Sequence, residues 1–186
     1  KASPRFDVFL KEFWEKVAAH WKPLTRHTND CYRGLYLDGA FPKRFVDEIT
    51  QAEVLKWFAR VSNTGGPGAA NRTMEILRTM MNKAEAWGYR EECSNPCQGI
   101  RPNRRRKYEC FLSNDELARL GAALQELKQE YPAQATAILV LALTGCRRSE
   151  ILGLTWGEVK GRRLLLHSSK TGPRTVWVGE EVRALI

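Results

Sequence analysis

Apolar residues recur every three or four positions through most of the first ninety residues, and this period restricts the fold more than any other feature. Such spacing gathers apolar side chains on one face of an α-helix. One helix is expected from Phe6 to near Trp21. Another is expected to begin at Pro23, because proline suits the first turn of a helix. The inner face of this second helix is predicted to carry Tyr32, Leu35 and Tyr36.

Two further helices are indicated before residue 90. Thr50 and Glu53 match a capping box, in which each side chain binds the other residue's backbone N–H, and they are expected to open the third helix. The sequence Gly-Gly-Pro-Gly at residues 65–68 predicts a loop, and a fourth helix follows it up to Gly88. The expected result is a four-helix bundle over residues 1–100.

A polar and basic stretch separates this bundle from a second region. Residues 101–110 lack apolar periodicity and are predicted to form an exposed linker. Ser113 and Glu116 match another capping box, which opens an amphipathic helix at the start of the second region. We expect residues 111–186 to be a separate domain.

The second region mixes helical and β-strand signals. A more apolar helix is expected from Pro132 to Leu143. The β-rich runs at residues 162–167 and 174–178 flank a turn sequence and predict a hairpin. A last helix is expected from residue 180, and since the sequence stops within it, we interpret this domain as incomplete.

Charge indicates the class of partner. The chain has 186 residues, 43% of them hydrophobic, and a formal net charge of +9. Two segments hold the whole excess: residues 101–107 contain five basic and no acidic residues, and residues 147–174 contain seven basic and two acidic ones. Such localisation indicates a polyanionic partner, most simply a nucleic acid. A solvated basic face, RNA or another acidic surface remain alternatives.

Several classes of protein are disfavoured. The longest strongly apolar run, residues 135–143, is well short of the roughly 18 residues that a membrane span requires. No signal peptide is visible, so a cytoplasmic protein without membrane contact is expected. The cysteine count is odd, which favours reduced thiols. Cys93 and Cys97 are the only close pair and have no histidine nearby, so neither a metal site nor a cofactor is predicted.

The most informative segment for chemistry is residues 144–150, Thr-Gly-Cys-Arg-Arg-Ser-Glu. It follows an apolar helix and is expected to start a new one. Arg147 would then lie beside unpaired backbone N–H groups, where anions bind, and its planar fork can hold two phosphate oxygens. Glu150 could fix an arginine by an ion pair. The alternative is a surface arginine pair at a helix start.

Lys170 is the second candidate. It lies in the turn of the predicted hairpin, where an amine could bind a phosphate or give a proton to a leaving oxygen. Lysine is also common in hairpin turns for purely structural reasons, so this position alone decides nothing.

The two segments together carry a resemblance. Thr-Gly-x-Arg-x-x-Glu at residues 144–150, followed by Ser-Lys-Thr-Gly-x-Arg at residues 169–174, resembles the tyrosine recombinases, specifically the phage integrases. Residues 71–77, 86–89 and 95–96 are similar to the core-binding domain of this family and its exit. Residues 111–117 are similar to the start of its catalytic domain. The resemblance therefore extends over nearly the whole chain.

This resemblance implies a fold, a reaction and roles for residues. The fold would be mainly α: a four-helix core-binding (SAM-like) bundle followed by the start of an α+β catalytic domain with a β-hairpin. Family enzymes recombine and integrate the DNA of mobile elements through a 3′-phosphotyrosine bond, without metal or ATP. Arg147 matches the first phosphate-binding arginine, Lys170 matches the lysine that protonates the leaving 5′-oxygen, and Glu150 matches the acid that supports the arginine. The partners would be the duplex DNA of an attachment-site core and, in a complete protein, three further copies in a tetramer.

The chain departs from the family pattern in one serious respect. The family's His-x-x-Arg box and its nucleophilic tyrosine should follow Lys170, but no tyrosine or histidine does. As written, the chain is expected not to cleave DNA. A non-catalytic DNA-binding remnant or accessory protein is therefore the alternative reading of its function.

Residues for DNA contact are expected in the bundle and in the linker. Two helix starts carry basic and polar side chains that could reach phosphates or a groove. These are Lys22, Thr25, Arg26, Asn71, Arg72 and Arg78. The linker is predicted to act as a strap on the DNA backbone through Arg101, Arg104, Arg105, Arg106 and Lys107. Each of these side chains could instead be a solvated charge.

Overall fold

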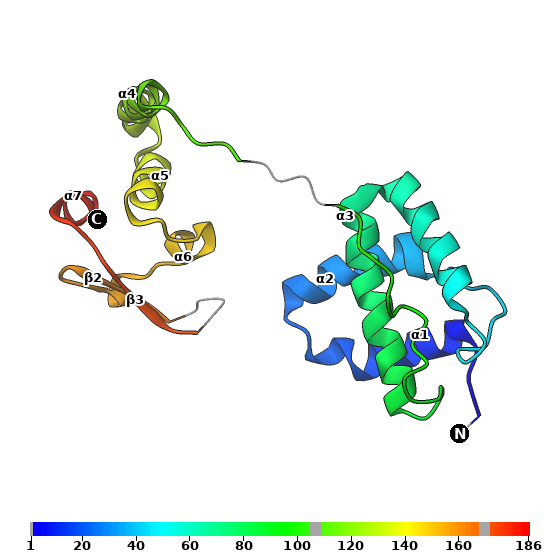
Figure 1. Cartoon of the computed structure of the whole chain (residues 1–186). Helices are drawn as coiled ribbons and strands as arrows, with labels where there is room; N and C mark the ends of the chain where they lie inside the picture. Colours follow the sequence, from blue (N-terminus) through cyan, green and yellow to red (C-terminus); the bar gives the residue numbers. More distant parts are fainter. Residues whose placement is uncertain (1, 105–108, 168–171) are drawn as a thin grey trace. The chain divides into compact units, whose positions relative to one another are not determined.

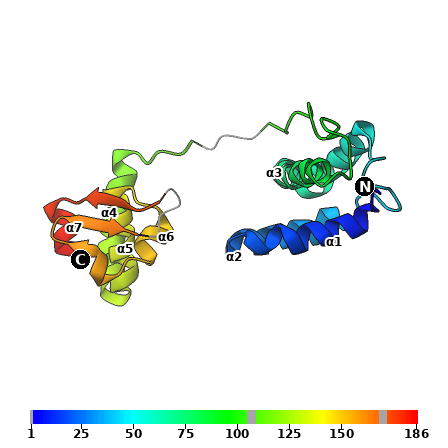
Figure 2. The same cartoon turned by 90° about the horizontal axis from the view of Figure 1, so that it is seen from below.

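The computed structural model describes residues 2–104, 109–167 and 172–186 of the chain (Figure 1). It divides into two compact units, Lys1–Tyr108 and Glu109–Ile186. In the described residues, the first unit is built from helices and the second combines helices with one small sheet (Figure 2). The expectation of a mainly helical fold with a hairpin near its end is confirmed.

Three long helices and two short ones form the first unit. They are α1 (Phe6–Lys16), η1 (Ala18–His20), α2 (Pro23–Tyr32), η2 (Arg33–Leu37) and α3 (Gln51–Ala86). The predicted capping box of α3 is present in both directions, since Glu53 N–H donates to Thr50 Oγ1 and Thr50 N–H donates to Glu53 Oε2. Trp14 Nε1 donates to Asp30 Oδ1 at 2.6 Å, which ties α1 to α2.

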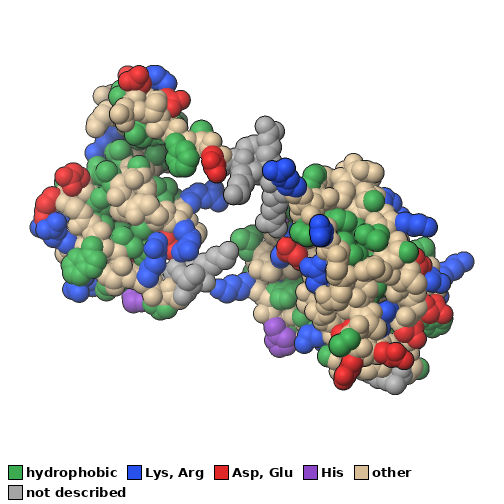
Figure 3. Space-filling model, viewed as in Figure 1, with side chains coloured by type: hydrophobic (Ala, Val, Ile, Leu, Met, Phe, Trp, Pro, Cys, Tyr) green, Lys and Arg blue, Asp and Glu red, His purple; other side chains and the backbone are tan. Residues whose placement is uncertain are grey.

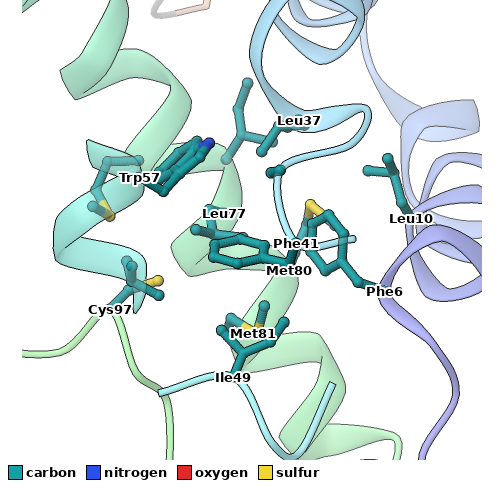
Figure 4. Close-up of a cluster of buried hydrophobic side chains, with 14 of the residues drawn as sticks. Phe6, Leu10, Leu37, Phe41, Ile49, Trp57, Leu77, Met80, Met81 and Cys97 are labelled. Carbon is teal, nitrogen blue, oxygen red and sulfur yellow. The ribbon is translucent and has the colours of Figure 1, made fainter. Parts of the chain in front are cut away.

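The core of the first unit gathers large apolar side chains from α1, α3 and the segment between η2 and α3. In Figure 4, Phe6 from α1, Phe41 from the intervening segment and Met80 from α3 converge on one another. Phe6 and Phe41 meet edge to face, with ring centroids 5.0 Å apart. Each fully buried side chain of this size contributes about 1.5–3 kcal/mol. The helical period read from the sequence therefore does mark the core.

Two details of this unit differ from expectation. The loop predicted at residues 65–68 is a single break inside α3, where Gly66 adopts φ 81° and ψ 168° and the helical path resumes at Pro67. Leu35, predicted on an inner face, is 70% exposed, and Leu37 is buried in its place. The cause is the π-helical winding of η2, whose wider turn rotates the side chains away from the 3.6-residue period.

The second unit packs helices against an antiparallel sheet. Its elements are α4 (Asn114–Glu130), α5 (Pro132–Thr144), α6 (Arg148–Leu152), η3 (Trp156–Glu158), β1 (Val159–Lys160), β2 (Arg163–Leu166), β3 (Arg174–Trp177) and α7 (Glu180–Leu185). The strand order is β1-β2-β3, and Leu164 pairs with Val176 across β2 and β3. Val140 of α5 and Val182 of α7 share one core with Leu164, so both helices cover the same face of the sheet.

The predicted hairpin is confirmed as β2 and β3, and β1 extends it by a short strand that the sequence did not signal. Its turn lies partly outside the described residues, which resume at Gly172. The capping box of Ser113 and Glu116 opens α4 as expected. Of the leucines in this helix only Leu124 is buried, so α4 buries less of its apolar face than its pattern indicates.

Candidate nucleic-acid interface

A buried carboxylate organises the candidate phosphate site of the second unit. The Glu150 side chain is 2% exposed and accepts hydrogen bonds from two arginines. Arg147 donates twice, from its backbone N–H at 2.8 Å and from Nη1 at 2.9 Å. Arg174 donates from Nη2 at 2.8 Å. The acid therefore holds two guanidinium groups that lie far apart in sequence.

Local backbone geometry explains why these groups meet. Helix α5 ends at Gly145, whose left-handed φ of 62° lets the chain turn sharply. Thr144 Oγ1 accepts the N–H of Cys146 at 3.3 Å and steadies this turn. Arg147 is extended and caps α6, which places Glu150 one turn away. Arg174 is the first residue of β3, and strand pairing brings it to the same carboxylate.

The electrostatics of this cluster are dominated by two arginines on one acid. One carboxylate faces two guanidinium groups whose side chains are 46% (Arg147) and 39% (Arg174) exposed. The hydrogen bond that Arg174 donates to Glu150, and then the negative charge of Glu150, raise the pKa of Arg174 above its ordinary value. Both guanidinium groups reach solvent, where they can bind an anion.

The ion pair expected between Arg147 and Glu150 is present, but the reasoning from the helix start needs correction. Helix α6 has only five residues. The backbone N–H of Arg147 is paired with Glu150, and the N–H of Glu150 donates to the carbonyl of Arg147 at 2.9 Å. The anion that binds the Arg147 N–H at this helix start is thus the protein's own carboxylate.

Lys170 lies outside the described residues. Sequence reasoning missed the role of Arg174. The only signal was its place at the end of the Ser-Lys-Thr-Gly-x-Arg motif, because its contact with Glu150 spans 24 residues of sequence.

In the first unit, part of the expected DNA-contact set lies together. Thr25 of α2 and Arg72 of α3 line one hollow of about 270 Å³. Arg72 Nη2 donates to Asn29 Oδ1 at 3.0 Å, and its Nη1 pairs with Glu75 at 3.1 Å. Lys22 is exposed at the start of α2, and Arg26, one turn on, is exposed as well.

Two residues of that set are turned inward. Asn71 is 3% exposed: its Nδ2 donates to the carbonyl of Asn103 at 2.9 Å, and its Oδ1 accepts the N–H of Asn103 at 2.7 Å. The expectation of an outward Asn71 side chain is therefore wrong. Arg78 is half-buried and donates from Nη2 to the carbonyls of Cys97 and Ile100, each at 3.3 Å. Both side chains bind the segment that leaves the first unit.

The predicted linker begins as part of the first unit. Asn103 is half-buried, and its Nδ2 also donates to Ser62 Oγ at 2.8 Å. Arg101 and Arg104 are exposed on either side of it. The remaining basic residues of the strap, Arg105, Arg106 and Lys107, lie outside the described residues.

The described residues give no sign of a metal or membrane site. Among them, no group of three or more His, Cys, Asp or Glu side chains could hold a metal ion. No helix in the described ranges is long and apolar enough to cross a membrane. All five cysteines are free thiols. Burial raises the pKa of the Cys97 thiol to about 12, so this side chain behaves as an apolar one.

Comparison with solved structures identifies the fold. No family model and no curated protein matches the sequence. A lambda integrase dimer bound to a COC′ core site superposes with a TM-score of 0.76 at 17% identity, over 95% of this chain and 49% of that one. This chain has the phage integrase fold. The Tn1549 transposon integrase in complex with circular intermediate DNA gives a TM-score of 0.76 at 16% identity, over 100% of this chain and 63% of that one.

The integrase fold accounts for both units. The match corresponds to the core-binding domain and the start of the catalytic domain, as the sequence resemblance implied. A lambda integrase tetramer bound to a Holliday junction also matches, with a TM-score of 0.74 at 17% identity, over 91% of this chain and 49% of that one. The chain thus spans about half the length of the lambda integrase chains that it matches.

Proposed function

We propose that this chain binds duplex DNA as the core-binding domain (residues 1–100), the basic linker (101–110) and the first part of the catalytic domain (111–186) of a site-specific recombinase of the phage integrase type. The observation that carries the proposal is the Arg147–Glu150 pair. A charged, half-exposed guanidinium is held by a buried acid at the motif position of the family's first phosphate-binding arginine. The solved integrases with this fold are bound to DNA.

The chemistry of this pair suits a phosphodiester. A guanidinium that is oriented before the reaction stabilises charge as it develops on the phosphate oxygens, and each such donor contributes a factor of about 10²–10³ to the rate. The bond to Glu150 provides that orientation, because it fixes one edge of the Arg147 fork. Arg147 would therefore bind the phosphate, and Glu150 would position Arg147.

Lys170 is the proposed proton donor to the leaving 5′-oxygen. It precedes Arg174 by four residues, and four residues of chain span at most about 14 Å. Since Arg174 contacts Glu150, this limit is compatible with an amine that approaches the phosphate bound by Arg147. The phosphotyrosine step would need a tyrosine from outside these 186 residues, since none of the five in the sequence follows Lys170.

DNA contact is proposed along both units. Lys and Arg side chains appear on the visible face of each unit (Figure 3). In the first unit, we assign phosphate contacts to the exposed Lys22 and Arg26, and groove contact to Thr25 and Arg72. The strap would add the five Lys and Arg side chains of residues 101–107. A homotetramer on DNA in a complete protein, a mobile element as the source and a cytoplasmic location remain predictions.

Salt-dependent binding to a fluorescent 25-base-pair duplex tests the DNA-binding proposal. If the strap neutralises five phosphates, it alone contributes about −4.5 to the slope of log affinity against log salt. Replacing Arg101, Arg104, Arg105, Arg106 and Lys107 by Ala should remove most of this contribution. A flat titration of the unchanged chain would refute DNA binding, and an unchanged slope in the variant would refute the strap. Excess duplex RNA as competitor separates the RNA alternative.

The non-catalytic alternative is tested by cleavage. A nicked suicide duplex traps the covalent protein–DNA bond that a tyrosine recombinase forms. In any longer form of this protein, Arg147→Ala should abolish that bond while DNA binding stays largely intact. Normal trapping by this variant would refute the role of Arg147, and the absence of trapping by the longer unchanged protein would favour the non-catalytic reading.

A further inference from the structure

Two arginines from distant parts of the second unit contact the one carboxylate of Glu150. Arg147 alone occupies both carboxylate oxygens, Oε1 through Nη1 and Oε2 through its backbone N–H. A buried carboxylate needs an opposite charge and hydrogen-bond donors, and Arg147 supplies both. Arg174 adds a second guanidinium on Oε2.

The two guanidinium groups are close to each other. The contacting nitrogens lie 2.9 and 2.8 Å from the two oxygens of one carboxylate, so they are within about 8 Å of each other. Like charges at this separation repel, and both arginines share the single negative charge of Glu150. An anion that touches both side chains would remove this repulsion. Because the two side chains are about 40% exposed, such an anion can approach from solvent.

We propose that Arg174 is a second phosphate-binding residue, and that Arg147 and Arg174 together bind one phosphodiester group of duplex DNA with Glu150 fixed between them. The inference rests on the proposed function and adds a residue to it. Arg174 is distinct from the second arginine that the family resemblance implies, since that residue belongs to a His-x-x-Arg box for which this sequence has no match. A planar guanidinium suits this role because it donates to Glu150 with one nitrogen while its other edge binds phosphate oxygens.

The competing explanation is a structural ion pair that only attaches β3 to α6. The two explanations predict different salt dependence. Each arginine that neutralises a DNA phosphate contributes about −0.9 to the slope of log affinity against log salt, whereas a structural arginine contributes nothing to it. A slope lowered by 0.9 corresponds to about 3.5-fold less loss of affinity between 50 and 200 mM salt.

The experiment compares four variants of the chain on one 25-base-pair duplex. Arg174→Gln and Arg147→Gln should each lower the magnitude of the slope by about 0.9, and Arg174→Lys should keep it. Arg183→Gln is the matched control, because Arg183 is also exposed and paired with a glutamate of the same unit, and it should leave the slope unchanged. If the salt slope is normal for Arg174→Gln and lowered for Arg147→Gln, the inference about Arg174 is overturned and the proposed function is not. A flat titration of the unchanged chain would overturn the proposed function instead.

A second measurement follows DNA binding by the unchanged protein, and a variant is needed only to assign the signal. The side-chain Nε–H signal of Arg174 is assigned by NMR from its loss in Arg174→Lys. It should move when a 12-base-pair duplex is added, while the Arg183 signal stays in place. An Arg174 signal that does not move at saturation would overturn the inference.

Discussion

Replacing Asn71 by Ala tests the most consequential correction that the structure makes to the sequence reading. A DNA-contacting Asn71 and a structural Asn71 lead to opposite expectations. In the structure, its amide donates to the carbonyl of Asn103 and accepts the N–H of Asn103, so the variant removes two hydrogen bonds at once. It also leaves both backbone groups of Asn103 without these partners.

The size of the effect follows from burial. An unsatisfied buried backbone group costs about 1–3 kcal/mol. Asn103 is half-buried, so water satisfies part of the loss, and we expect the first unit to lose about 2 kcal/mol of unfolding free energy. For a domain of this size, that loss lowers Tm by roughly 10 °C. Affinity for duplex DNA, measured at 10 °C where the variant is folded, should change less than about 2-fold, since the Asn71 amide is buried and bound to Asn103.

Circular dichroism gives the Tm and fluorescence anisotropy gives the affinity. Asn63→Ala is the matched control, because Asn63 is an exposed asparagine of the same helix, and its Tm should stay within about 2 °C of the unchanged chain. A normal Tm for Asn71→Ala together with a 10-fold loss of DNA affinity would refute the structural role and restore the DNA contact.

Three further outcomes are expected. Glu150→Gln removes the charge that holds two half-exposed arginines, so it should lower the unfolding free energy of the second unit by about 1–3 kcal/mol. Urea unfolding measures this loss, and an unchanged unfolding midpoint would contradict the organising role of this acid. Gly66→Ala should lower the unfolding free energy by about 1–3 kcal/mol, because the φ and ψ of Gly66 are accessible only to glycine. An unaffected Tm would contradict this and would mean that the break in α3 can straighten. Hydrogen bonds from the N–H groups of Thr155 and then His167 lower the pKa of Glu158 below its value in the unfolded chain. The contribution of Glu158 to stability is therefore present above the pKa of the unfolded state, and it is lost as the pH falls through the pKa of the folded state. The difference in Tm between the unchanged chain and Glu158→Gln should therefore shrink from pH 6 to pH 3, and a constant difference would contradict this assignment.

Local signals predicted much of the fold. The capping box of Thr50 and Glu53 was readable because both partners lie three residues apart, and the structure contains both of its hydrogen bonds. The inner face of α1 was readable for a similar reason, since helical geometry alone decides which side chains share a face. Leu35 was assigned to the wrong face because a π-helical turn changes that geometry, and no residue pattern in this segment indicates such a turn.

Only part of the candidate site could be predicted from the sequence, because its other contacts join segments that are distant in the chain. The pair of Arg147 and Glu150 follows from a spacing of three residues. The contact of Arg174 with Glu150 and that of Asn71 with Asn103 span 24 and 32 residues, and each depends on how helices and strands pack. Patterns in sequence show which side chains are polar, but tertiary packing decides whether a polar side chain faces DNA or the protein backbone.

Glu158 and Glu150 accept hydrogen bonds from residues on either side of the segment that connects β2 to β3. Residues 168–173 connect β2 to β3 and include Lys170. Just before this loop, His167 N–H donates to Glu158 Oε1 at 3.3 Å, and just after it Arg174 donates to Glu150 at 2.8 Å. Fixing both ends of a short loop limits the positions open to the residues between them, and small displacements of a reacting group cost large factors in rate. We therefore expect Glu158→Gln, in a longer and cleavage-competent form of the protein, to slow strand cleavage more than it weakens DNA binding. The reason is that Glu158 binds the backbone N–H of His167 and carries no proposed phosphate contact. Equal losses in both measurements would contradict the anchoring role.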